Sequence, residues 1–156
     1  MINSELVPAE NLGVKHAKWD KKAGLKVNRD CYNSYLFRTE DEDLDIIDKF
    51  TMHGKEVLKY LDGGSSAFIN LKEIPSKGTW KLIMQKAIDA GTSYWTANIK
   101  STYCNECGYI DMNTRDSCIK CGSTKVDYLT RIVGYLKKIK SFSEARQKEA
   151  STRFYH

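Results

Sequence analysis

The chain has 156 residues and a formal net charge of +5. That length suits one domain of ordinary size, able to bury roughly two-thirds of the surface of its unfolded form. No apolar run approaches the roughly 20 residues that a helix needs to cross a bilayer, and the first residues do not resemble a signal peptide, so we expect a cytoplasmic protein without membrane partners. The mild basic excess is compatible with nucleic acid, with nucleotide phosphates or with solubility alone.

The first third of the chain lacks a sustained periodic pattern. Residues 1–30 mix proline and glycine with scattered polar residues, which predicts mainly loop with one short strand. The aromatic-rich run Tyr32–Phe37 favours a strand. Acidic residues in the range 40–48 then supply N-caps and first-turn carboxylates for one continuous helix, which we expect to end at Gly63 and Gly64.

Residues 67–99 alternate between strand and helix patterns. Ala67–Leu71 has the composition of a short buried strand. A helix follows from Ser76, with apolar residues at three- and four-residue intervals and Gly91 in the C′ position. Ser93–Ile99 is expected to be the next strand. This alternation predicts a mixed α/β fold.

The composition changes after the last of these strands. Residues 101–125 are rich in Cys, Gly, Asn, Asp and Ser, which indicates a small separate module. A strand is expected over residues 126–133, and a final helix over residues 141–154 with Ser143 as its N-cap.

Four of the five cysteines form two Cys-x-x-Cys pairs, Cys104 with Cys107 and Cys118 with Cys121. One such turn brings two thiolates to the same ion, and zinc prefers four thiolates in a tetrahedron. Each pair is followed by glycine, which suits a turn that needs an unrestricted φ. Four protein ligands leave no position for water or substrate, so the expected zinc is structural, with iron or a thiol–disulfide role as alternatives. The remaining Cys31 is expected to be a small buried apolar residue.

A single glycine interrupts the bulky sequence Arg131-Ile-Val-Gly134-Tyr-Leu136. Glycine costs about 1 kcal/mol relative to alanine inside a helix or strand, so some feature should require it at this position. Taken alone, it is explained by a tight turn or by the close approach of another backbone.

The two cysteine pairs and the glycine-containing segment 131–136, taken together, resemble the C-terminal portion of the anaerobic (class III) ribonucleotide reductases, which are glycyl-radical enzymes. That family carries a four-cysteine zinc site, a strand, an Arg-x-x-Gly-Tyr-Leu loop and then a helix with a characteristic pattern of polar residues. Gly134 matches the radical glycine. Segments 3–11, 60–64 and 68–71 also look like family segments, so the resemblance covers nearly the whole chain. The matching residues of the final helix are Phe142, Gln147, Lys148, Glu149 and Arg153.

The resemblance implies three parts: residues 1–100 as the C-terminal part of a glycyl-radical-enzyme α/β barrel, residues 101–128 as a four-cysteine zinc ribbon, and residues 129–156 as a glycyl-radical loop with a C-terminal helix. It implies an oxidoreductase that reduces ribonucleotides to deoxyribonucleotides. An activating enzyme with an iron–sulfur cluster and S-adenosylmethionine would remove one Cα hydrogen from Gly134. The radical would then pass to a cysteine that abstracts the ribose 3′ hydrogen.

Family members also carry an ATP cone, most of a ten-stranded barrel and a loop with the thiyl-forming cysteine, and this sequence contains none of them. Cys31 lacks the context of that loop. We therefore expect a larger partner chain, in either a split reductase or an excised fragment. Glu10, ahead of Glu5, is a candidate partner for a ribose hydroxyl, and an ordinary surface carboxylate is the alternative.

Two other functions stay open from the sequence. A free-standing repair module could replace an oxygen-cleaved radical domain, although it would need only the C-terminal stretch. A zinc-ribbon protein could bind nucleic acid through the basic residues 137–140, with an affinity that falls steeply with salt. The second alternative leaves Gly134 unexplained, and we expect no direct contact with nucleic acid.

Overall fold

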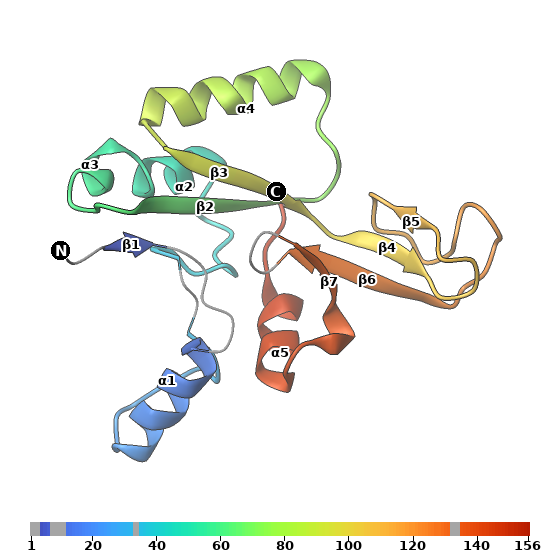
Figure 1. The fold of residues 1–156 in the computed structure, drawn as a ribbon, viewed down its shortest axis with the longest axis horizontal. Helices are drawn as coiled ribbons and strands as arrows, with labels where there is room; N and C mark the ends of the chain where they lie inside the picture. The colour runs from blue at the N-terminus through green and yellow to red at the C-terminus, as the bar shows by residue number, and fades with distance from the viewer. Residues whose placement is uncertain (1–3, 7–11, 33–34, 132–134) are drawn as a thin grey trace.

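The computed structural model describes residues 4–6, 12–32, 35–131 and 135–156. Within these ranges the chain forms a three-stranded sheet in the order β1-β2-β3 and a four-stranded sheet in the order β5-β4-β6-β7 (Figure 1). The strands are β1 (Glu5–Leu6), β2 (Gly64–Leu71), β3 (Tyr94–Ile99), β4 (Ser101–Cys104), β5 (Ile110–Asp111), β6 (Val126–Arg131) and β7 (Leu136–Lys138). The helices are α1 (Leu12–Lys22), α2 (Ile46–Met52), α3 (Lys55–Leu58), α4 (Lys77–Ala90), the 3₁₀ turn η1 (Ile139–Ser141) and α5 (Glu144–Thr152). None of the helices described is both long and apolar enough to span a bilayer.

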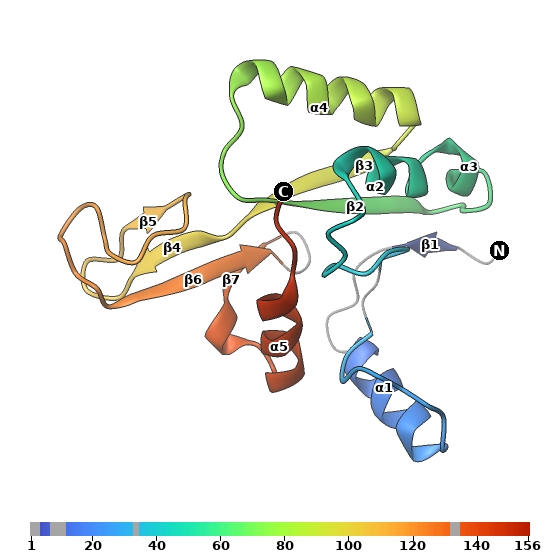
Figure 2. The same ribbon diagram turned by 180° about the vertical axis from the view of Figure 1, so that it is seen from behind.

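The first sheet is parallel, and α4 connects its two long strands. β2 and β3 pair from Ser66 with Tyr94 to Leu71 with Ile99. Helices α2 and α4 cover one face of this sheet (Figures 1 and 2). The buried apolar core between them consists of Phe50, Ala67, Ile69, Leu71, Ile83 and Ala87. The prediction of a mixed α/β fold is confirmed.

Helix α4 has the boundaries that its sequence signals indicate. The Ser76 side chain accepts a hydrogen bond from the backbone amide of Thr79 at 3.1 Å, which caps the first turn. Gly91 ends the helix in the left-handed conformation with φ of 72°. Both flanking strands form where the apolar runs predicted them, with β2 extended back to Gly64.

The single helix expected before Gly63 is wrong, because the structure contains two helices. Helix α2 begins with a capping box between Asp45 and Asp48, and it ends at Met52. The backbone then breaks at His53 and Gly54 before α3 begins. A Cβ atom on Gly54 would lie 2.3 Å from the carbonyl oxygen of Ala90, so the break follows from a close approach to the end of α4.

The N-terminal predictions are right for β1 and for the loop over residues 23–30, and wrong for residues 12–22 and 32–37. Helix α1 occupies residues expected to be loop; only Gly13 and Ala17 on it are buried, so it presents no apolar stripe. A Cβ on Gly13 would lie 2.0 Å from the carbonyl oxygen of Tyr32, which explains this glycine. The described part of residues 32–37 is not a strand, and its aromatic rings pack together, with Tyr35 stacked on Phe37 at 5.4 Å between centroids.

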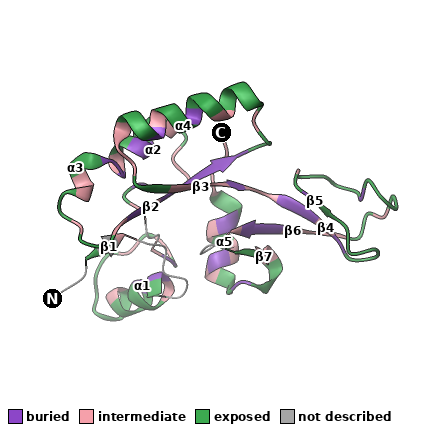
Figure 3. Cartoon of the chain, turned by 45° about the horizontal axis from the view of Figure 1, so that its top comes forward, coloured by how far each residue is buried: buried purple, intermediate pink, exposed green. Residues whose placement is uncertain are grey.

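The second sheet is antiparallel and extends to one end of the molecule. β4 pairs with β6 from Ser101 with Leu129 to Cys104 with Val126. The chain then returns beside β6 as β7, a strand that the sequence did not predict. Helix α5 follows, with Ser143 at the N-cap position as expected but without a side-chain capping bond. Figure 3 shows the mixture of buried and exposed residues along α5, whose buried residues are Arg146 and Ala150.

Candidate functional site

The four cysteines of the two Cys-x-x-Cys pairs converge at the end of the β4-β6 ladder. All four sulfur atoms lie within 4.8 Å of one another. The sulfurs of Cys104 and Cys121 are 3.6 Å apart, and those of Cys107 and Cys118 are 3.7 Å apart. Sulfurs bound to one zinc ion at about 2.3 Å in a tetrahedron would be separated by about 3.8 Å. The spacing of the donors therefore fits a tetrahedral metal ion such as zinc.

Each cysteine pair sits on a turn that glycine allows to close. Gly108 and Gly122 have φ values of 71° and 72°, in the left-handed region that other residues rarely adopt. Their amides donate to the carbonyl oxygens of Cys104 and Cys118 at 3.0 and 2.8 Å. The amide of Lys120 also points at the sulfur of Cys118, at 3.4 Å. The glycine after each pair is expected to provide an unrestricted φ, and both glycines adopt a positive φ.

The surroundings shift the pKa values of two of the four thiols, Cys104 and Cys121, in opposite directions. Hydrogen bonds from backbone amides, above all that of Cys107, lower the pKa of the Cys104 thiol to about 7 against the opposing effect of burial. At Cys121 the amide of Ser123 lowers the pKa, but the neighbouring thiols, with Cys107 first, and burial raise it to about 12. Four adjacent sulfurs cannot all be thiolates without a compensating positive charge. A divalent ion that prefers sulfur would supply that charge.

Strand β6 links this cysteine cluster to the segment that contains Gly134. It begins at Val126, which pairs with Cys104, and ends at Arg131, which pairs with Leu136 of β7. The three residues 132–134, and therefore Gly134 itself, lie outside the described residues. Glu10 also lies outside them. The structure thus brings the four cysteines together and leaves the predictions for Gly134 and Glu10 untested.

A buried polar cluster surrounds the last two residues of β6, and sequence reasoning missed most of it. The amide oxygen of Asn98 accepts from the Thr130 hydroxyl and from the Arg131 backbone amide, both at 3.0 Å. From the other side, Nη1 of Arg153 donates to the Thr130 hydroxyl and to the Arg131 carbonyl oxygen, both at 3.3 Å. The sequence marks Arg153 only through the family pattern of the final helix, and nothing in the sequence distinguishes Asn98 from other polar residues in strands.

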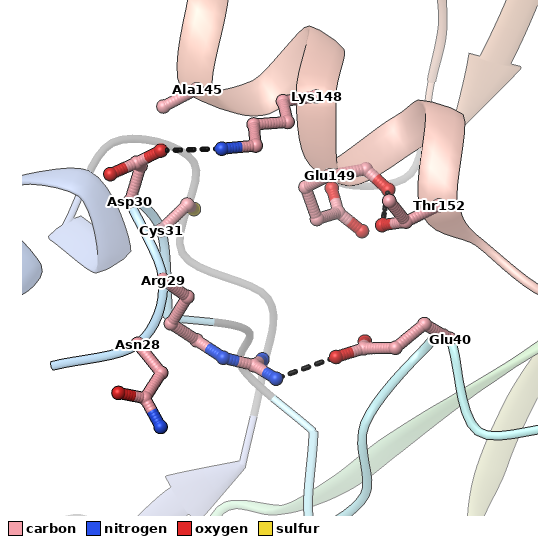
Figure 4. A pocket seen from close by; sticks show the side chains of 9 residues that line it. All are labelled: Asn28, Arg29, Asp30, Cys31, Glu40, Ala145, Lys148, Glu149 and Thr152. Carbon is pink, nitrogen blue, oxygen red and sulfur yellow. Dashed lines mark hydrogen bonds and ion pairs between the residues drawn. The ribbon is translucent and has the colours of Figure 1, made fainter.

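The cavity nearest to Cys31 does not form a reactive site. It has a volume of about 220 Å³ and lies between the segment 28–31 and α5 (Figure 4). The charged groups at its rim are paired, Arg29 with Glu40 at 2.6 Å and Lys148 with Asp30 at 2.9 Å. Burial raises the pKa of the Cys31 thiol, and the side chain is only 5% exposed. Cys31 is a buried apolar residue, as predicted.

The family model and the solved structures that match this chain describe the same kind of enzyme. A family model described as anaerobic ribonucleoside-triphosphate reductase matches residues 1–156. A search of curated proteins finds no match. A solved anaerobic ribonucleotide reductase is 30% identical, with a TM-score of 0.83 over 99% of this chain and 25% of its own length. The anaerobic ribonucleotide reductase from Thermotoga maritima in complex with dATP and CTP is 28% identical, with a TM-score of 0.77 over 96% of this chain and 24% of its own.

This chain thus spans about a quarter of the length of the solved structures that it resembles. Its mixed α/β fold and its four-cysteine cluster are the features on which the sequence and the structure agree. The chain belongs to the anaerobic ribonucleoside-triphosphate reductase family of oxidoreductases and corresponds to part of the enzyme.

Proposed function

We propose that this chain is the glycyl-radical-bearing part of an anaerobic ribonucleotide reductase and that Gly134 carries the radical. The observation that supports this most directly is the pairing of Arg131 with Leu136, the last residue of β6 and the first of β7. Gly134 lies in the connection between these paired strands, and β6 begins beside the cysteine cluster. The family model matches the full chain, which supports a role for this arrangement in ribonucleotide reduction.

Glycine suits a backbone radical for a steric reason. A radical at Cα is stabilised when the centre becomes planar and the unpaired electron delocalises onto the flanking amides, and a Cβ atom would crowd that planar form. The proposed activating enzyme, with an iron–sulfur cluster and S-adenosylmethionine, takes one Cα hydrogen atom from Gly134. A cysteine on the larger part of the enzyme then returns a hydrogen atom to Gly134 and becomes the thiyl radical that abstracts the ribose 3′ hydrogen of the ribonucleotide.

The metal in this proposal is zinc, and its role is structural. Cys104 ends β4 and pairs with Val126 at the start of β6, so an ion bound by the four sulfurs fastens the base of the strand that leads to Gly134. Rigid support matters because a displacement of about 1 Å at a reacting centre can reduce the rate about 100-fold.

The rest of the reductase has to come from a larger partner region, since related structures are about four times as long as this chain. We propose that residues 1–100 complete its barrel, that residues 101–128 form the zinc ribbon, and that residues 129–156 carry the radical loop and its helix. Glu10 is proposed to contact a ribose hydroxyl. Unchanged turnover and nucleotide affinity in Glu10→Ala would rule that contact out.

The two alternatives are less well supported. The family match extends over the first hundred residues, which a repair module would not need. For nucleic-acid binding, the basic stretch offers few unengaged charges, because Lys138 and Lys140 contact the Asp127 carboxylate at 3.3 and 2.5 Å. Lys138 also lies over the Tyr103 ring, 3.8 Å from its centroid.

The test is anaerobic electron paramagnetic resonance of the chain combined with the larger part of the enzyme, the activating enzyme, S-adenosylmethionine and a reductant. We expect a doublet that collapses when glycine is deuterated at Cα and that is absent in Gly134→Ala. The matched control, Gly78→Ala on α4, should keep the doublet. Absence of any radical with an activating enzyme that is competent on another reductase would overturn the proposal.

A further inference from the structure

The end of β6 is held by side chains on both of its flanks, immediately before the connection that contains Gly134. Thr130 is fully buried, and Asn98 is 2% exposed. The Arg131 amide bonds to Asn98, and the Arg131 carbonyl oxygen bonds to Arg153. The two polar groups of this peptide backbone are thus bound by residues from two other elements, β3 and the segment that follows α5.

The Asn98 amide can adopt only one orientation in this arrangement. A backbone amide and a hydroxyl both donate to the same atom, which must therefore be the oxygen. The nitrogen of Asn98 then faces β2, where it donates to the side-chain oxygen of Asn70 at 2.9 Å. Buried bonds of this kind are costly to leave unmade, so the network fixes β6 relative to the parallel sheet.

Arg153 is fixed just as firmly. Its Nε and Nη2 donate to the two carboxylate oxygens of Glu149 at 2.8 and 3.0 Å, a paired geometry that leaves Nη1 directed at Thr130 and Arg131. The Arg153 side chain is 5% exposed and that of Glu149 is 10% exposed. Glu149 outweighs the effect of burial and raises the pKa of Arg153, which keeps its charge.

The segment that carries Arg153 is anchored to the parallel sheet as well. The amide of His156 donates to Asn70 O at 3.0 Å, and the amide of Lys72 donates to His156 O at 2.8 Å, so the residues after α5 pair with β2. Figure 1 shows the end of the chain beside β2. Asn98 and Arg153 therefore both connect the last residues of β6 to the parallel sheet.

We propose that Asn98 and Arg153 are positioning residues that set the location of Gly134 relative to the thiyl-forming cysteine. This inference rests on the proposed function, since it assumes that Gly134 carries the radical. The network reaches Arg131, three residues before Gly134, and acts through the backbone without touching substrate. Its loss should leave hydrogen abstraction by the activating enzyme intact and slow the transfer of the radical within the assembled reductase.

The sharpest variant is Thr130→Val, which keeps the shape of the side chain and removes the hydroxyl that joins Asn98 to Arg153. Arg153→Lys keeps the charge beside Glu149 but loses the planar fork that reaches β6. Asn98→Asp keeps the acceptor for the Arg131 amide, and Asn98→Ala loses it. The matched controls are Thr152→Val, whose hydroxyl bonds only to the Glu149 carbonyl among the contacts described, and Arg38→Lys in an exposed ion pair with Asp41.

The measurements are glycyl radical per chain by electron paramagnetic resonance, turnover per radical in the assembled enzyme, and zinc per chain. We expect Thr130→Val and Arg153→Lys to retain the radical and the zinc while turnover per radical falls at least 10-fold. Asn98→Asp should retain more turnover per radical than Asn98→Ala, and both controls should match the parent.

Unchanged turnover per radical in Thr130→Val and Arg153→Lys would overturn the positioning role and leave the radical assignment standing. A proportional loss of radical and turnover would also overturn it, because the network would then serve stability alone. If the parent protein forms no glycyl radical, the proposed function fails, and this inference fails with it.

Discussion

The backbone of Gly54 lies directly against the carbonyl oxygen of Ala90, and a Cβ atom at position 54 would stand 2.3 Å from that oxygen. Gly91, which follows Ala90, has a φ of 72° and faces Lys55 at the start of α3. The junction between α2 and α3 therefore packs against the C-terminal end of α4 at a distance that only glycine permits.

Gly54→Ala should destabilise the protein by about 2–4 kcal/mol, because the clash involves two backbone segments that cannot move independently. Gly78→Ala is the matched control. Its added Cβ would meet nothing closer than 3.8 Å, and it lies in the first turns of α4, so the substitution should stabilise the protein by about 0.5–1 kcal/mol. Urea unfolding at constant pH measures both. Similar free energies of unfolding for Gly54→Ala and Gly78→Ala would contradict the close approach of Gly54 to Ala90.

The four-sulfur cluster predicts one zinc ion per chain with four sulfur ligands at about 2.3 Å. Elemental analysis gives the stoichiometry, and X-ray absorption gives the ligands. Cys107→Ser should lose most of the zinc, since the remaining three sulfurs no longer close the cage. Cys31→Ser is the control and should keep the zinc, because Cys31 lies outside the cluster. A coordination shell with fewer than four sulfurs would contradict the assignment.

Thiol reactivity provides an independent count of the cysteine environments. In the folded zinc-bound protein the four cluster thiolates are protected by the metal, and Cys31 is buried with a raised pKa, so alkylation should be very slow. Removal of the zinc by a chelator should remove the protection of the cluster, with the exposed Cys107 labelled before the buried Cys104 and Cys118, and denaturation should make all five thiols reactive. Mass spectrometry after timed alkylation measures this sequence. Rapid labelling of Cys31 in the native protein would show that its burial is wrong.

The elements predicted correctly are those whose signals are local. Helix α4 has a side-chain cap at Ser76, regular apolar spacing and a C-terminal glycine, and these features lie within its own sequence. Helix α1 has no such stripe, because its burial depends on the contact between Gly13 and Tyr32. The break after α2 likewise depends on Ala90, which lies far along the chain. Long-range backbone contacts of this kind do not produce a periodic pattern of apolar residues in the sequence.

The same distinction separates the parts of the candidate site. The spacing of the four cysteines is enough to predict that they form one cluster. Each Cys-x-x-Cys pair lies within a short segment, and the glycine that follows it indicates a tight turn. The network around Thr130 joins residues from β3, β6 and the end of the chain, and asparagine and threonine are common in strands for many reasons. Only their meeting in space shows that the backbone of Arg131 is bound on both sides.

A buried histidine makes stability depend on pH. His53 is 0% exposed, its Nδ1 contacts the hydroxyl of Ser65, and its Nε2 has no partner among the described residues. Burial lowers the pKa of His53 below its ordinary 6.5, and burial together with the charge of Lys49 lowers that of His156. Both histidines are therefore neutral in the folded protein at neutral pH.

The sign of the effect follows from proton uptake. As the pH falls below about 6.5, the unfolded chain binds protons that the folded protein does not, so the free energy of unfolding decreases by up to about 1.4 kcal/mol per pH unit for each histidine. The loss stops once the pH is below the folded-state pKa values. Urea unfolding at pH 7.5 and pH 5.5 should show the decrease, and His53→Gln should reduce it. The control His16→Gln, at an exposed position on α1, should retain the decrease of the parent, and equal pH dependence in His53→Gln would show that His53 is not its source.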